Sequence, residues 1–270
     1  MKIPRDTRSL RLALAMLLSA LPVAGRCVEL GEIGSANHIE AGVSYSNLTN
    51  GYSDWRGTYV RGAWHQNKDL TWDFEANHDQ RYDQTGQYYA VGATYLFNED
   101  WFGSLHYGVG SDVVFFPKSR VDAAINYRWL EQRNLITTLG VGHINENDNL
   151  HENKYVLLGA SYYFTSPFII EAGLTKYYSS PGDVESDRVF LALTYGQDKV
   201  RYITLRHDTG NEAYQLVSEE QTLVDFDSNV TTLIWREWWR KNIGTNLLLE
   251  FYENPFYERR GAALGVFVDF

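Results

Sequence analysis

Most of this chain is built from segments of 10 to 13 residues in which apolar and polar side chains alternate one by one. The clearest segment, at about 119–130, places Val121 and Ile125 on one side of the alternation and Asp122 and Asn126 on the other. Successive side chains of a β-strand point to opposite faces, whereas a helix brings residues three and four apart together. The alternation therefore predicts strands with one apolar and one polar face.

We count fourteen such segments, with twelve as an alternative. Very short links alternate with longer ones, and the longest, expected at about 210–226, is the candidate for a loop that folds inward and constricts the barrel. In the twelfth segment Trp238 and Trp239 are neighbours, which indicates a β-bulge or an interfacial cluster. The segments lie at about 38–48, 56–65, 70–80, 86–97, 101–113, 119–130, 135–146, 153–164, 168–178, 187–196, 199–209, 228–239, 243–253 and 259–270.

The composition fits strands that cross a membrane. Hydrophobic residues make up 44% of the chain and aromatic residues 15%, yet the mean hydropathy is −0.36. A membrane helix needs about 20 consecutive apolar residues, whereas a transmembrane strand needs about 9 to 11 and is apolar on one face only. A helical membrane protein is therefore excluded, and a soluble periplasmic β-sandwich or barrel is the alternative to a membrane barrel. The net charge of −10 argues against nucleic acid as a partner.

The N-terminus has the features of a secretory signal peptide. Basic residues precede an uncharged apolar run at 12–24 that is too short to cross a bilayer as a helix. We expect a cleaved signal peptide at 1–27, with the cleavage site between residues 24 and 27, and a short periplasmic segment at 28–37. The outer-membrane β-barrel then occupies 38–270. The single cysteine, Cys27, excludes an internal disulfide.

The C-terminus predicts both assembly and closure of the barrel. The last segment ends on an aromatic residue, as bacterial outer-membrane proteins do, and we expect Gly265, Val268 and Phe270 to form the signal read by the barrel-assembly machinery. In lipid every backbone polar group needs a partner within the protein, so the first and last strands must pair. The strand near Ile39 should therefore pair with the strand ending at Phe270, and an even strand number leaves both termini in the periplasm.

The polar rows of the segments are expected to line the lumen. Acids and bases are both present, and the structural interpretation is that they pair, because an unpaired buried charge is costly. The functional interpretation is a polar conduit or a solute site. Fourteen strands enclose more space than the eight of a self-filled barrel and less than the 16 to 18 of open porins. The candidate lumen-lining residues are Glu40, Arg61, Asp73, Glu75, Asp122, Arg128, Glu171, Arg206 and Glu250.

Nothing in the sequence predicts catalysis. The Gly-x-Ser-x-Gly elbow of hydrolases is absent, and the seven histidines are scattered without the spacing of a metal site. His78 and His207, each followed by an aspartate, are the only candidates for a catalytic pair. We expect no enzyme activity, no cofactor and no metal.

From His38 to Phe270 the chain resembles the YaiO family of outer-membrane β-barrel proteins. The resemblance rests on the order and spacing of the segments, on the stretch Thr209-Gly210-Asn211-Glu212-Ala213-Tyr214, and on the terminal strand. It implies an integral outer-membrane protein. Some members lie beside glycosyltransferase and polysaccharide-modifying genes, which implies a part in surface-polysaccharide export.

Three functions follow from these features. The leading hypothesis is a non-enzymatic barrel that forms a transport conduit or supports polysaccharide export, with outer-membrane lipid, the assembly machinery and polysaccharide or its export proteins as partners. The alternative is a plugged structural barrel that acts as a surface adhesin or phage receptor. The third is an outer-membrane lipase or protease.

Overall fold

The computed structural model describes residues 37–218 and 221–270. The expected signal peptide lies outside the described residues, as does nearly all of the expected periplasmic segment. The strands are β1 (His38–Leu48), β2 (Trp55–His65), β3 (Leu70–Arg81), β4 (Gln84–Leu96), β5 (Trp101–Gly110), β6 (Pro117–Trp129), β7 (Leu135–Glu146), β8 (Glu152–Tyr163), β9 (Phe168–Ser180), β10 (Val184–Gln197), β11 (Arg201–Leu216), β12 (Thr222–Arg240), β13 (Ile243–Glu253) and β14 (Glu258–Asp269).

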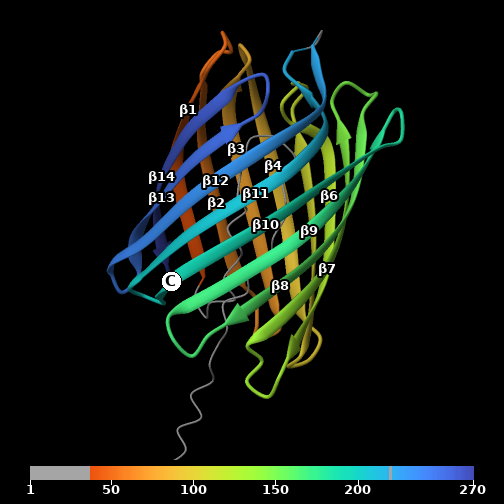
Figure 1. Ribbon diagram of the computed structural model, residues 1–270. Helices are drawn as coiled ribbons and strands as arrows, with labels where there is room; N and C mark the ends of the chain where they lie inside the picture. Colours follow the sequence, from red (N-terminus) through yellow and green to blue (C-terminus); the bar gives the residue numbers. More distant parts are fainter. Residues whose placement is uncertain (1–36, 219–220) are drawn as a thin grey trace, which may run out of the picture.

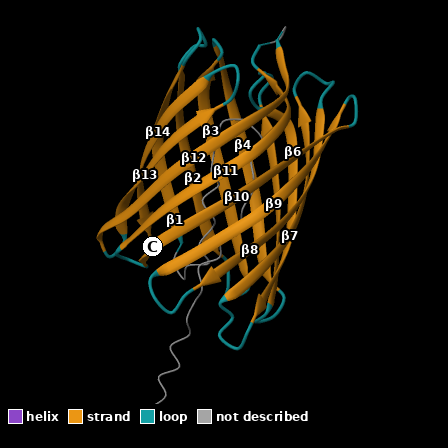
Figure 2. Ribbon diagram, viewed as in Figure 1, coloured by secondary structure: helices purple, strands orange, loops and turns teal. Residues whose placement is uncertain are grey.

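The fourteen strands form one closed antiparallel barrel in which each strand pairs with its neighbours in sequence (Figures 1 and 2). The predicted closure is confirmed, because β1 pairs with β14 and Ile39 lies opposite Val268. The backbone of Asn37 and that of Phe270 exchange two hydrogen bonds, at 3.0 and 2.8 Å, where the seam ends. The part of the chain that the structure describes contains no candidate membrane-spanning helix.

The two ends of the barrel hold different parts of the chain. We call the end that holds His38 and Phe270 the terminal end, and the opposite end, where β1 leads into β2, the far end (Figure 1). The prediction that the terminal end faces the periplasm remains a prediction.

The outer face of the barrel is apolar. Large side chains of the outward row stay exposed, for example Leu105 at 58%, Leu191 at 59% and Val43 at 57%. Such a surface is stable in lipid and not in water. Exposed aromatic side chains gather near the terminal end, as in the interfacial girdles of membrane barrels. They are Trp64, Trp72, Tyr95, Phe97, Trp101, Trp129, Tyr162, Phe164, Phe168, Tyr195, Trp235 and Trp239.

The prediction of a long connection at 210–226 is wrong. Strand β11 continues to Leu216 and β12 begins at Thr222, so the link shrinks to 217–221. The two strands pair from Glu212, opposite Phe226, to Leu216, opposite Thr222, except at Ala213 and Asp225. Sequence pattern missed this hairpin because its outward residues, such as Asn211 and Asp227, are polar, so that the alternation that marks lipid-facing strands stops.

The expected contrast between short and long links is also largely absent. The shortest link at the terminal end has two residues (241–242) and the longest has five (130–134). At the far end the shortest has two residues (82–83) and the longest has six (111–116). The reason is the same as for the hairpin: strands at the far end continue as regular hydrogen-bonded structure where loops were expected.

The predicted irregularity in the twelfth segment is a β-bulge. The register of β12 against β13 shifts between Trp238 and Arg240. The two tryptophans lie on opposite faces, as neighbours in a strand do: Trp238 is buried at 6% exposure and points inward, while Trp239 is 61% exposed on the outer face.

A charge on the outer face should be costly. Leu205 lies in the outward row of β11 and is 53% exposed. We expect Leu205→Arg to lower the free energy of unfolding by about 2–4 kcal/mol, because the charge must enter the hydrocarbon of the bilayer. Guanidinium unfolding in lipid vesicles measures this change. The control is His207→Arg, two residues nearer the far end and already polar, for which we expect a loss of no more than about 1 kcal/mol.

Candidate functional site

The structure places all nine candidate lumen residues on the inward row of their strands. The strand register puts Glu40 of β1 opposite Arg61 of β2, and Arg61 opposite Glu75 of β3. Five of the nine are buried, namely Glu40, Asp122, Glu171, Arg206 and Glu250, and the other four are partly buried.

Most of these charges meet an opposite charge inside the barrel. Arg61 Nη2 lies 2.9 Å from Glu40 Oε1, and Arg259 Nε lies 2.8 Å from Glu250 Oε1. The remaining pairs and hydrogen bonds are Arg120 Nε to Asp122 at 2.7 Å, Arg206 Nε to Asp208 at 2.7 Å, His106 Nε2 to Asp73 at 3.5 Å, Ser161 Oγ to Glu171 at 3.2 Å, Arg128 Nη1 to the Glu99 carbonyl at 2.9 Å, and Asn77 to Glu75. Six of the nine therefore have a charged or ionisable partner, which stabilises an ionised group at the wall, whereas Glu75, Arg128 and Glu171 hydrogen-bond to neutral groups.

Aromatic rings of the inward row lie against glycines of the adjacent strand. A side chain at Gly108 of β5 would collide with the ring of Tyr88 on β4, and a side chain at Gly142 of β7 would collide with Tyr155 on β8. The glycines therefore give the rings room to lie along the wall. The same arrangement recurs for His106 over Gly92, Phe190 over Gly173, Phe267 over Gly244 and Tyr59 over Gly42.

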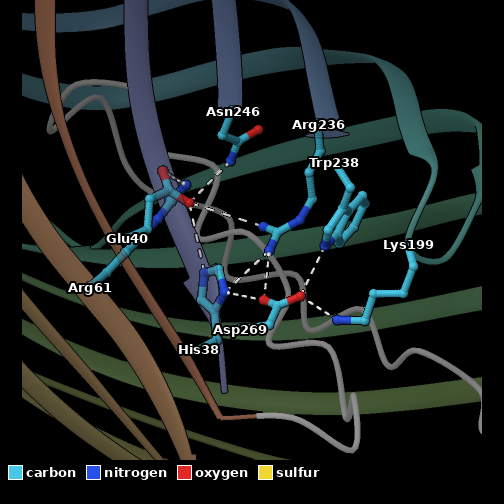
Figure 3. A network of polar contacts seen from close by, with 8 residues as sticks. All are labelled: His38, Glu40, Arg61, Lys199, Arg236, Trp238, Asn246 and Asp269. Atoms are coloured by element: carbon cyan, nitrogen blue, oxygen red, sulfur yellow. Dashed lines mark hydrogen bonds and ion pairs between the residues drawn. The ribbon is translucent and has the colours of Figure 1, made fainter. Parts of the chain in front are cut away.

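A polar network joins the strands of the seam at the terminal end (Figure 3). Its first centre is Asp269 of β14, which accepts a hydrogen bond from Trp238 Nε1 at 2.9 Å. His38 Nδ1 lies 3.0 Å from Asp269 Oδ1, and Lys199, in the link between β10 and β11, forms an ion pair with the other oxygen. Arg236 of β12 lies 3.9 Å from the same carboxylate.

The second centre of this seam network is Glu40, which is fully buried (Figure 3). Besides the ion pair with Arg61, it accepts a hydrogen bond from the Tyr59 hydroxyl at 2.7 Å and one from Asn246 Nδ2 at 3.4 Å. Arg236 Nη1 lies 4.0 Å away and bridges the two centres. The network therefore crosses the closure from β12 to β2 with side-chain contacts in addition to the backbone ladder.

The three residues expected to form the assembly signal lie on two faces of β14 and its end. Gly265 lies beside the seam network, and the other two lie on the outer face. Gly265 faces inward, and a side chain there would collide with the Glu40 carboxylate and the Tyr59 hydroxyl. Val268 and Phe270 belong to the outward row, and Phe270 is 69% exposed. The glycine thus has a packing role of its own, which is separate from its expected role in assembly.

Sequence analysis missed most of the seam network. Arg236 and Asp269 could have been found by extending the inward row to the ends of their segments. Arg236 lies on the same face of its strand as Thr232, and Asp269 on the same face as Gly265. Lys199 gave no signal, because it is the first residue of the expected segment at 199–209, and the structure places it in the link before β11 instead.

At the far end the hairpin of β11 and β12 contacts links on both of its sides. Gln215 Nε2 donates to the Tyr257 hydroxyl at 2.7 Å and to the Tyr82 hydroxyl at 3.3 Å. Tyr257 belongs to the link before β14 and Tyr82 to the link before β4, so the hairpin reaches across several strands of the barrel. Burial raises the pKa of Tyr257 above its ordinary value.

On its other side the hairpin meets the link between β7 and β8. The rings of Tyr214 and His151 lie 4.1 Å apart. Asp148 holds this link in shape: burial favours its neutral form, but hydrogen bonds from the side chain and backbone of His151 outweigh that effect and keep the pKa of Asp148 below its usual value. Asn147 Nδ2 donates to the carbonyl of Phe116 at 2.8 Å and so ties in the link before β6.

An apolar cluster joins the hairpin to the strands around the seam. It contains Leu48, Trp55, Val217, Leu223, Phe226, Tyr252 and Tyr257, drawn from both sides of the hairpin and from the strands around the seam. Two guanidinium groups border this cluster, since Arg81 and Arg259 lie 4.8 and 4.5 Å from the ring of Trp55. The mouth therefore combines apolar packing with arginines stacked on an aromatic ring.

The two histidines considered for catalysis are not brought together. His78 lies on β3 and His207 on β11, six strands apart around the barrel. Their aspartate neighbours face inward and pair with arginines, Asp79 with Arg81 and Asp208 with Arg206. Groups of three or more metal-binding side chains are absent from the described part of the chain.

Solved membrane proteins share this fold. The chain is similar to the CymD monoaromatic hydrocarbon channel, with 7% identity, a TM-score of 0.58, and coverage of 87% of this chain and 88% of that one. A bacterial polysaccharide outer membrane secretin matches with 11% identity, a TM-score of 0.52, and 87% and 98% coverage. The outer membrane protein Omp33 of Acinetobacter baumannii matches with 9% identity, a TM-score of 0.52, and 87% and 99% coverage.

At these identities the structures establish the fold and nothing finer. No curated protein matches the sequence. The sequence model of a family described as "YaiO membrane beta barrel domain" matches residues 36–215, well over half of the 270 residues. Together with the closed barrel and its apolar outer face, this match establishes that the chain belongs to the YaiO family of membrane β-barrels and resides in the outer membrane.

Proposed function

We propose that this barrel is a non-enzymatic transport conduit whose far mouth is closed by the hairpin of β11 and β12. The observation that carries the proposal is the wall itself: inward aromatic rings lie over glycines of the next strand, and inward charges pair along the wall. Both arrangements keep bulky side chains away from the barrel axis. A barrel of fourteen strands is also wider than one that its own side chains fill.

We propose polysaccharide as the transported class, either moved through this barrel or exported with its support. The family resemblance and the likeness to a polysaccharide outer membrane secretin support this class. The partners in this proposal are outer-membrane lipid, the barrel-assembly machinery and polysaccharide export proteins. The terminal end would then face the periplasm and the hairpin the cell exterior.

A plugged barrel that serves as a surface receptor is the second candidate. The observation that favours it is the number of contacts at the far mouth, where Gln215, Tyr214 and Asn147 link four different connections. In that case the hairpin would be a permanent closure and a surface for other molecules.

Single-channel recording in planar bilayers separates these two functions. We expect the purified wild-type protein to give small or infrequent openings, because the hairpin covers the mouth. Replacing residues 213–225 by Asn-Gly leaves Glu212 and Phe226, which already pair, joined by a two-residue turn. This shortened-hairpin variant should conduct several times more, and Gln215→Ala should open more often than Gln197→Ala, a control at the terminal end.

Replacing inward charges gives a second test by the same recordings. Arg128 and Arg206 face the lumen, so Arg128→Gln or Arg206→Gln should change the conductance or ion selectivity of the shortened barrel. A shortened barrel that stays silent would refute the conduit and leave the receptor as the better function.

A further inference from the structure

Arg259, at the far end of β14, has buried donors without a protein acceptor. It is 1% exposed, and its Nε donates to Glu250 Oε1 at 2.8 Å. Its Nη1 and Nη2 have no hydrogen-bond partner among the described residues. Buried donors in native proteins are almost always satisfied, so these groups call for an acceptor that enters from outside the chain.

Two aromatic rings surround this guanidinium. Its Cζ lies 4.5 Å from the ring centre of Trp55 and 4.5 Å from that of Tyr252. Stacking of this kind orients the planar group and leaves its edge available for hydrogen bonds. Trp55 Nε1 is a further buried donor without a partner in the described part of the chain. The rings supply apolar surface beside the unsatisfied donors; Trp55 shares its ring with Arg81, whose Cζ lies 4.8 Å from the ring centre.

An unsatisfied acceptor lies next to one of these residues, Tyr252. Glu212 of β11 is 2% exposed, and its Oε1 accepts from Arg188 at 3.2 Å and from the Tyr252 hydroxyl at 3.3 Å. Its Oε2 has no partner among the residues described. Tyr252 thus touches both groups, with its ring against Arg259 and its hydroxyl on Glu212.

These unsatisfied groups define the chemistry of a ligand that fits them. It must accept hydrogen bonds from Arg259, donate one to Glu212 and place a C–H face on an aromatic ring. A fully ionised phosphate accepts but does not donate, and an alkyl chain does neither. A pyranose ring meets all three demands, because its hydroxyls donate and accept while its axial C–H groups form an apolar face. We propose that Trp55, Tyr252, Arg259 and Glu212 form a saccharide-binding subsite beneath the hairpin.

The hairpin controls access to this subsite. Trp55 packs in the same apolar cluster as Val217 and Leu223 of the hairpin, so the subsite is closed while the hairpin is in place. A ligand then binds only the fraction of molecules in which the hairpin has moved, and its apparent affinity falls by that fraction. The inference deepens the proposed function and rests on it in one respect, that polysaccharide passes this mouth.

Calorimetric titration of the purified protein with maltohexaose and with hexagalacturonate tests the subsite. The shortened-hairpin variant keeps all four residues and should bind more tightly than the wild type. In that background, Arg259→Met combined with Glu250→Leu removes the ion pair without leaving a buried charge unpaired. Binding should weaken by about tenfold to a hundredfold, the range for hydrogen bonds to a charged group. Arg260→Met, at the next position and on the outer face, should leave the affinity unchanged.

The sugar titrations can uphold or overturn the subsite. Binding of maltohexaose that depends on Arg259 identifies hydroxyl recognition, and binding of hexagalacturonate alone places a sugar carboxylate on the guanidinium; either upholds the subsite. No binding to the shortened variant overturns it, as does binding that survives the double replacement. If heat-modifiable gel migration shows that the double variant has not folded, Trp55→Leu takes its place and should weaken binding likewise. A conducting barrel that binds neither sugar refutes the subsite alone, whereas sugar binding by a silent barrel refutes only the conduit.

Discussion

Replacing Glu40 by alanine should lower the free energy of unfolding by about 3–5 kcal/mol, because two arginines would lose a buried counter-charge. Arg236 is 9% exposed and Arg61 is 25% exposed in their side chains, and both contact this carboxylate. The Tyr59 hydroxyl and the Asn246 amide would lose an acceptor in the same step. Guanidinium unfolding of the barrel in lipid vesicles measures the loss.

A matched variant on β14 isolates the effect of burial. Glu258 pairs with Arg260 at 3.2 Å, but the exposed fractions of these side chains are 45% and 71%. An exposed pair contributes at most about 1 kcal/mol, so Glu258→Ala should change the unfolding free energy by no more than that. Equal losses in the two variants would mean that the seam network adds nothing to closure.

A double-mutant cycle tests whether Glu40 acts through its arginine partner. Adding Arg61→Leu to Glu40→Leu removes both members of the pair that lies at 2.9 Å. The loss in the double variant should be smaller than the sum of the two single losses, because residues in direct contact are coupled. Additive losses would show that the two side chains stabilise the seam independently.

The seam illustrates what the sequence pattern can and cannot predict. Alternation identified the outward row from Ile39 to Val268 and, with the rule that no edge may remain open, the pairing of the first and last strands. It also placed Glu40 and Arg61 on the inward row. The pattern did not predict that Glu40 meets Arg236, because contacts across the closed end depend on the register of four successive strands.

The far mouth was not predictable for a different reason. Hydropathy alternates only where one face of a strand meets lipid, and the hairpin beyond Thr209 has polar residues on its outward side. Glu212 therefore looked like part of a loop, although it is buried against Arg188 and Tyr252. The stretch from Thr209 to Tyr214 that carries the family resemblance is the part of β11 that leads into this hairpin.

The terminal aromatic side chain should matter for assembly far more than for the folded barrel. Phe270 is 69% exposed, and its backbone, through two hydrogen bonds with Asn37, completes the seam whatever its side chain. Phe270→Ala should therefore change the unfolding free energy of refolded protein by no more than about 0.5 kcal/mol, as is usual for surface substitutions. In cells the same variant should lose most of its heat-modifiable barrel from the outer-membrane fraction, if the assembly machinery reads this residue.

The comparison with Phe168→Ala makes the assembly effect specific. Phe168 is also an outward aromatic residue at the terminal end, with 40% of its side chain exposed, but it begins β9 in the middle of the chain. It should leave the amount of barrel in the membrane close to that of the wild type. If both variants reach the membrane equally, the terminal phenylalanine is only one more residue of the aromatic girdle. If both are lost equally, the cell requires the girdle as a whole, and the chain end carries no signal of its own.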